Sequence, residues 1–94
     1  MAEEQQAHRV KRLAMRSMRR GIKEMDLILS DYAAARLGDM DAPALDLYDR
    51  LLSENDHDLY QWVTGQVAAP RHYAALVADI QSRFAHGSRQ PSEG

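Results

Sequence analysis

The sequence predicts an all-α protein, a compact bundle of about five helices in one domain. Apolar residues recur at three- and four-residue spacing along most of the 94 residues, and no segment alternates apolar and polar residues over a convincing length. Short connections separate the periodic segments, which favours antiparallel packing of neighbouring helices. We therefore expect a flexible N-terminus at residues 1–7, a single helical domain at residues 8–86 and a disordered tail at residues 87–94.

Gly21 separates the first two predicted helices. The first covers about residues 8–19, and the second begins at Ile22 and stops at Leu37, where Gly38 is suited to act as a C-terminal cap. Each helix has one apolar face, formed by Val10, Leu13, Ala14 and Met18 in the first and by Met25, Ile28, Leu29 and Tyr32 in the second.

Capping residues mark three further helices. Asp41 is suited to cap a third helix that ends near residues 53–55, and Asp56 is suited to cap a short fourth helix that Gly65 ends. Pro70 opens a fifth helix that ends near residue 86. We expect their buried residues to be Leu45, Tyr48, Leu51 and Leu52, then Leu59, Trp62 and Val63, then Tyr73, Leu76, Val77, Ile80 and Phe84.

The composition excludes several classes of site. The chain has no cysteine, and its four histidines lack the spacing of a metal-binding motif. It has no glycine-rich nucleotide-binding loop and no nucleophile elbow. We therefore expect no catalytic residue, no metal and no stably bound cofactor, so that the chain is not an enzyme.

Hydropathy and the N-terminal residues bear on location. No apolar run approaches the ~20 residues that span a bilayer, and the first six residues lack the basic-then-apolar order of a secretory signal. The absence of cysteine fits a reducing compartment. We expect a soluble cytoplasmic protein without membrane insertion.

The charges are distributed unevenly along the chain. Seven of the twelve basic residues lie before position 24, whereas residues 24–58 hold ten acidic residues against two arginines. Such a surface suits an oriented protein partner better than DNA, because the acidic half would repel a polyanion. Two alternatives stay open at this point: a nucleic-acid-binding or regulatory module that uses the basic N-terminal helix, and a structural bundle without a partner site.

Residues 19–25, with the sequence RRGIKEM, are the most informative about function. Two arginines, a glycine and a carboxylate meet there at one predicted helix start. Gly21 permits unusual backbone angles or a close contact, and Glu24 lies near the positive end of the next helix. This pattern predicts an exposed charged turn that binds a partner. The alternative is a helix boundary in which Gly21 is a cap and the arginines are solvated.

The chain resembles the SdhE family of small flavinylation factors, which includes the mitochondrial succinate dehydrogenase assembly factor. The family motif RGxxE is present at residues 20–24. A second match, at residues 50–62, has paired leucines, an acidic turn, an Asp-Leu pair and a tryptophan. The two matches lie within a resemblance that covers about residues 9–84.

We expect the helical fold to be monomeric. The resemblance implies a binding protein that assists covalent attachment of FAD to the flavoprotein subunit of succinate dehydrogenase, and often of the related fumarate reductase. It implies that the bonded histidine belongs to the partner, which forms the bond to the flavin 8α-methyl carbon itself. The absence of a long N-terminal extension resembles a bacterial, cytoplasmic member of the family.

The resemblance also assigns partner-binding roles within and beside the motif. Gly21 would allow contact between its backbone and the partner, and Arg20 would pair with acidic or carbonyl groups. Glu24 would accept hydrogen bonds from the partner or hold Arg20 in position, and Arg19 and Asp26 are further candidates. If the turn is a contact surface, Arg20→Ala and Glu24→Ala should change the melting temperature little.

Overall fold

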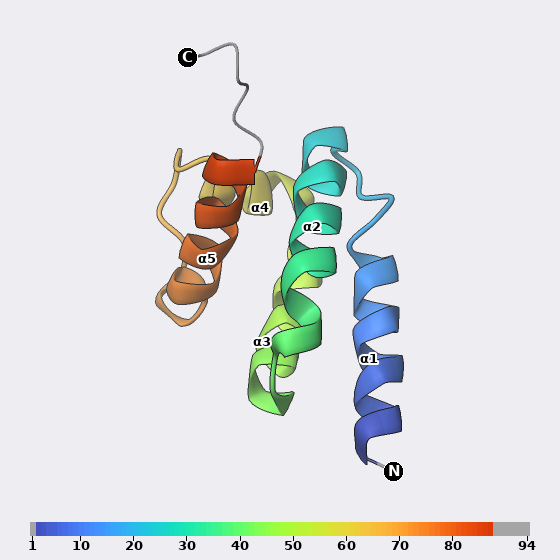
Figure 1. The fold of residues 1–94 in the computed structure, drawn as a ribbon. Helices are drawn as coiled ribbons and strands as arrows, with labels where there is room; N and C mark the ends of the chain where they lie inside the picture. The colour runs from blue at the N-terminus through green and yellow to red at the C-terminus, as the bar shows by residue number, and fades with distance from the viewer. Residues whose placement is uncertain (1, 88–94) are drawn as a thin grey trace.

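Helices are the one kind of regular secondary structure in the part of the chain described by the computed structural model, which covers the backbone of residues 2–87 and the side chains of residues 5–83 (Figure 1). No strand occurs within residues 2–87, so the all-α prediction is confirmed. The elements are α1 (Ala2–Arg16), α2 (Lys23–Arg36), the 3-10 helix η1 (Leu37–Asp39), α3 (Ala42–Leu52), α4 (Asp56–Val63) and α5 (Arg71–Gly87).

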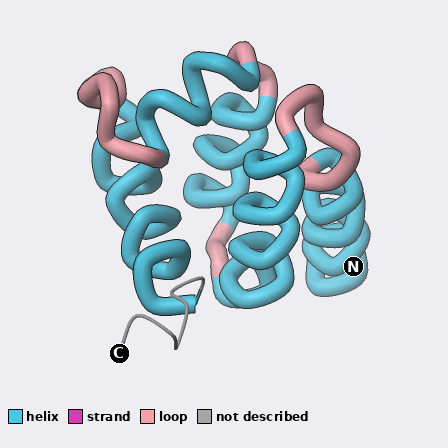
Figure 2. The backbone as a smooth tube through the Cα atoms, turned by 90° about the horizontal axis from the view of Figure 1, so that it is seen from above, coloured by secondary structure: helices cyan, strands magenta, loops and turns pink. Residues whose placement is uncertain are grey.

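The second helix lies at the centre of the bundle. It packs against α1, α4 and α5, while α3 packs against α1 and α5. Figure 1 shows α1, α2 and α3 running antiparallel in turn, as the short connections predict. Figure 2 views the bundle from above and shows the helices grouped side by side with the loops at their ends.

The predicted apolar faces meet in one core. Its residues from the two central helices include Met25, Leu29, Tyr48 and Leu51, all of them buried. Trp62 is 9% exposed and lies against Tyr73, with their ring centroids 5.8 Å apart. The predicted core is thus confirmed, except that the side chain of Phe84 lies outside the described residues and Met18 is exposed.

A buried polar pair joins α1 to α3. The Ser17 side chain is fully buried, and its Oγ lies 2.5 Å from the hydroxyl of Tyr48 and 2.8 Å from the carbonyl oxygen of Leu13. Because buried polar groups without partners are costly, these bonds are what allows a hydroxyl pair inside the core. The sequence does not indicate that Ser17 is buried, because a position at a helix end suggests exposure.

The ends of the first and last helices differ from expectation. α1 begins at Ala2, not near His8, because Ala, Glu and Gln favour helix without an apolar pattern. Gln6 also ties this segment to the core by donating from Nε2 to the Met40 carbonyl at 2.9 Å. The expected tail began at residue 87, but Gly87 belongs to α5, and residues 88–94 lie outside the described residues.

Two predicted caps are confirmed and two are wrong. Asp41 caps α3, since its Oδ1 accepts from the Ala44 amide at 3.1 Å, and Gly65 ends α4 with a φ of 83°. Asp56 does not cap α4, because Asn55 fills that position and accepts from the amide of residue 57 at 2.7 Å. Gly38 does not cap α2, because the chain continues into η1 without a positive φ.

The packing of Trp62 gives a first testable prediction. Trp62→Ala removes a large buried side chain, so it should lower the free energy of unfolding by about 3–5 kcal/mol. Urea denaturation followed by circular dichroism measures the change. A loss below about 1 kcal/mol would contradict the packing described here.

Burial of tyrosines makes stability depend on alkaline pH. Burial raises the pKa of Tyr48 from its usual value to about 12, and burial likewise raises the pKa of Tyr32 and Tyr73. The folded state therefore holds the phenolic proton more tightly than the unfolded state between about pH 10 and pH 12, and the free energy of unfolding falls across this window.

Tyr48→Phe should make that fall less steep, because one of the three contributing hydroxyls is removed. Urea unfolding of the wild type and of Tyr48→Phe, repeated between about pH 8 and pH 11.5, measures both slopes. Equal slopes in the two proteins would contradict the burial of an ionisable hydroxyl at this position.

Candidate functional site

The candidate site is the connection between α1 and α2. α1 ends at Arg16, and the chain turns through Arg19, whose φ of 56° is in the left-handed region. α2 begins at Lys23 after Ile22, which makes no side-chain capping bond. The local sequence thus supplies neither a glycine at the left-handed position nor a capping side chain.

The carboxylate of Asp56, the first residue of α4, holds this connection in place. Its Oδ1 accepts from Nε of Arg20 at 2.9 Å and lies 2.8 Å from the terminal NH2 nitrogen of the same side chain. Its Oδ2 accepts from the Gly21 amide at 2.6 Å. The side chains of Arg20 and Asp56 are only 12% and 20% exposed, so this pair is largely shielded from water.

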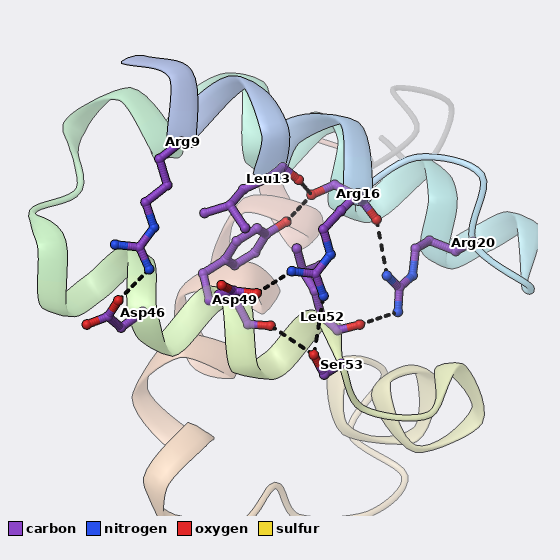
Figure 3. Close-up of polar contacts among 10 residues, drawn as sticks. Arg9, Leu13, Arg16, Arg20, Asp46, Asp49, Leu52 and Ser53 are labelled. Atoms are coloured by element: carbon purple, nitrogen blue, oxygen red, sulfur yellow. Dashed lines mark hydrogen bonds and ion pairs between the residues drawn. The ribbon is translucent and has the colours of Figure 1, made fainter. Parts of the chain in front are cut away.

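The same guanidinium also binds two helix ends. Its NH2 nitrogen donates to the Leu52 carbonyl at 2.9 Å, and its NH1 nitrogen donates to the Arg16 carbonyl at 3.1 Å (Figure 3). These residues end α3 and α1, where a positive charge is favoured, and Asp56 begins α4, where a negative charge is favoured. We call the set of Arg20, the Gly21 amide, Asp56 and these two carbonyls the Arg20 clamp.

Gly21 is required by a close approach and not by its backbone angles. Its φ is not in the left-handed region, which Arg19 occupies instead. A Cβ atom at position 21 would lie 2.9 Å from Oδ2 of Asp56, nearer than real Cβ contacts come. A side chain there would therefore displace the carboxylate that holds Arg20.

The structure separates the five predicted site residues. It brings Arg20 and Gly21 together in the clamp, and Asp26 is half-buried and accepts from the Ser30 hydroxyl at 3.3 Å. Arg19 and Glu24 are exposed, and within residues 5–83 their side chains take part in no hydrogen bond or ion pair. Glu24 therefore does not hold Arg20, because Asp56 does. Partner binding by these five residues stays a prediction.

Exposed apolar side chains flank the turn. Met18 is 47% exposed and Leu27 is 63% exposed. Met18 was expected to face the core, but α1 has ended before it. Methionine adapts to partner surfaces, so Met18 is suited to a contact beside the charged residues of the turn. We call the exposed residues Met18, Arg19, Lys23, Glu24 and Leu27 the turn surface.

Some of the basic residues of α1 pair with acidic residues of α3. Arg9 pairs with Asp46 and Arg16 pairs with Asp49, so the basic α1 binds the acidic α3 (Figure 3). Together with Arg20 in the clamp, three of the arginines near the N-terminus pair with aspartates. This weakens the alternative of a nucleic-acid-binding helix, which needs free cations along one face.

Two further features are absent from the part of the chain that the structure describes. Within the described residues, no cluster of three or more His, Cys, Asp or Glu side chains could hold a metal ion. No helix in residues 2–87 is long and apolar enough to cross a membrane.

Comparison with known proteins finds one family. The model of a family described as the flavinator of succinate dehydrogenase matches residues 11–84. The chain is 45% identical over 62 residues to the mitochondrial succinate dehydrogenase assembly factor 2 of Schizosaccharomyces japonicus, covering 66% of this chain and 43% of that protein. For the protein of the same name from Candida glabrata, identity is 53% over 53 residues, covering 56% of this chain and 35% of the relative.

An insect protein is also similar. The mitochondrial succinate dehydrogenase assembly factor 2-B of Drosophila mojavensis is 42% identical over 67 residues, which are 69% of this chain and 43% of that protein. The chain thus spans less than half the length of the relatives described here.

The relatives correct one expectation. We expected a bacterial cytoplasmic protein, but each of these relatives is named as mitochondrial and comes from a eukaryote, so that expectation is wrong. It rested on the composition of the first residues, on the lack of cysteine and on the absence of a long N-terminal extension in this sequence, and none of these properties identifies a compartment.

The clamp predicts a large difference between two adjacent arginines. Arg20→Ala leaves the Asp56 carboxylate unpaired at a shielded position and should lower the free energy of unfolding by about 2–3 kcal/mol. Arg19→Ala is the matched control and should stay within about 0.5 kcal/mol of the wild type. Urea denaturation measures both.

This prediction replaces the expectation that Arg20→Ala changes stability little. If Arg20→Ala and Arg19→Ala proved equally stable, the contacts of Arg20 would not contribute to folding.

Proposed function

The chain belongs to the family of flavinators of succinate dehydrogenase, and we propose that it binds the flavoprotein subunit of this enzyme and promotes covalent attachment of FAD. The resemblance inferred from the RGxxE motif is thereby confirmed. The match of the family model over residues 11–84 is the observation that carries the proposal, because it includes the helices and the turn that form the candidate site.

In this proposal the chain is a binding protein and not an enzyme. The flavoprotein subunit supplies the residue that becomes bonded to FAD, and this chain holds the subunit in the reactive arrangement. The chain holds no FAD of its own, in keeping with the lack of a nucleotide-binding motif in its sequence. We propose further that it acts as a monomer and also serves the related fumarate reductase flavoprotein.

We place the contact with the flavoprotein at the turn surface. Glu24 is exposed and without a partner within residues 5–83, so its carboxylate is available to accept hydrogen bonds from arginine, lysine or amide groups. Arg19 presents an opposite charge five residues earlier. The Gly21 amide is occupied by Asp56, but Gly21 itself is exposed and has no side chain, so the partner's backbone can approach it closely.

Apolar side chains supply the remainder of this proposed contact. Met18 and Leu27 expose area that loses contact with water on binding, which favours association. Charged groups beside an apolar patch fix the orientation of the partner. This combination is what a surface needs in order to hold a flavoprotein in one defined arrangement.

The proposal predicts that Glu24→Ala impairs flavinylation without unfolding the chain. Loss of a hydrogen-bonded carboxylate should weaken binding to the flavoprotein subunit by about tenfold or more, since bonds to charged groups contribute about 1.5–3 kcal/mol. The readout is in-gel flavin fluorescence of the denatured subunit, taken from cells that lack their own factor and express a variant of this chain.

Asp39→Ala is the matched control, because Asp39 is also an exposed acid, at the opposite end of α2. Wild type and Asp39→Ala should restore fluorescence, and Glu24→Ala at equal protein level should not. Full rescue by Glu24→Ala would remove Glu24 from the contact. Failure of the wild type to raise fluorescence would contradict the proposed function.

A further inference from the structure

We propose that Asp56 is a positioning residue for the turn surface, and that Arg20 of the RGxxE motif acts inside the chain while Glu24 meets the partner. The inference rests on the proposed function, because it concerns how the same surface is held in a shape that the flavoprotein recognises.

The turn has no local means of holding its shape. Arg19 adopts a left-handed conformation that is unfavourable for a residue with a side chain, and Ile22 begins α2 without a capping bond. Residues in such conformations persist when the surrounding structure determines them. The contacts that do so here come from α4, since Asp56 binds the two residues that lie between Arg19 and Ile22.

Asp56 is available for this task because it does not cap its own helix. Asn55 takes the capping position and binds the amide of residue 57. Both carboxylate oxygens of Asp56 therefore face the turn, one toward Arg20 and the other toward the Gly21 amide. An ionised carboxylate accepts at both oxygens, which a capping role would not leave free.

Arg20 is poorly placed to meet a partner. All three of its nitrogens donate within the chain, to Asp56, to the Leu52 carbonyl and to the Arg16 carbonyl. A guanidinium has five N–H donors and these contacts occupy most of them, so a partner carboxylate could form a bidentate pair with Arg20 only by displacing some of these bonds. The exposed charged side chains of the turn surface make no such bonds within residues 5–83. Glu24 is the acidic residue among them.

Gly21 links the two roles. A Cβ at this position would lie 2.9 Å from Oδ2 of Asp56. A side chain there would therefore push aside the same carboxylate that holds the turn. The geometry thus makes Gly21 and Asp56 energetically dependent on each other. Mutations of residues in contact are not additive, and a double-mutant cycle measures this dependence.

The experiment is a double-mutant cycle on binding to the flavoprotein subunit, measured by isothermal titration calorimetry with the full chain. Asp56→Ala and Gly21→Ala should each raise Kd by about tenfold or more. The double variant should bind within about threefold of Asp56→Ala alone, because the clash at position 21 has lost its target. All titrations are run at a temperature at which circular dichroism shows every variant folded.

Asp41→Ala is the matched control for stability. It removes the cap of α3, far from the turn, and should lower the melting temperature while leaving Kd within about twofold of the wild type. A role of Asp56 in stability alone predicts the same behaviour for Asp56→Ala. The proposal is overturned if folded Asp56→Ala binds like the wild type, or if the two effects in the cycle add.

A second variant and a second readout guard against ambiguous outcomes. If Asp56→Ala does not fold, Asp56→Asn keeps the size of the side chain and should raise Kd by about threefold, and binding at wild-type strength overturns the proposal. Hydrogen exchange of the Gly21 amide in the free chain needs no partner. The amide should exchange slowly in the wild type and faster in the Asp56 variants, and fast exchange in the wild type overturns the proposed clamp.

The two proposals fail in different ways. Absence of binding by the wild type contradicts the proposed function, whatever the Gly21 amide does. Wild-type binding together with an unaffected Asp56→Ala contradicts the positioning role alone.

Discussion

The contact of Asp56 with Arg20 and the Gly21 amide is the interaction on which the candidate site depends. It joins the start of α4 to the connection between α1 and α2, and through Arg20 it also holds the carbonyl ends of α1 and α3. Removing one member of a shielded ion pair is more costly than removing an exposed charge, because the other member stays without a partner. The clamp therefore ties the shape of the turn surface to the stability of the bundle.

The clamp gives the two ends of the RGxxE motif different tasks. The Arg20 side chain and the Gly21 amide are bonded within the molecule, whereas the Glu24 side chain is exposed. The motif is therefore not one exposed charged turn. Arg20 and Gly21 support the structure, and Glu24 is the candidate contact. The basic first helix follows the same rule, because Arg9 and Arg16 pair with aspartates of α3.

The sequence predicts features that depend on near neighbours. Helical periodicity identifies the core, and Asp41 is recognised as a cap because its acceptor and the Ala44 amide lie three residues apart. The local sequence does not show whether Asn55 or Asp56 caps α4, since both residue types suit the position. The outcome depends on the contact of Asp56 with Arg20, 36 residues away. The burial of Ser17 likewise depends on Tyr48, 31 residues away. Contacts between distant residues decide these details, and periodicity carries no information about them.

The central claim is that the flavoprotein subunit of succinate dehydrogenase binds the turn surface. Hydrogen–deuterium exchange of the backbone, compared with and without this subunit, tests it directly. Our account predicts slower exchange at residues 18–27 in the complex and unchanged exchange along α5. Slower exchange in α5 together with no change at residues 18–27 would contradict it.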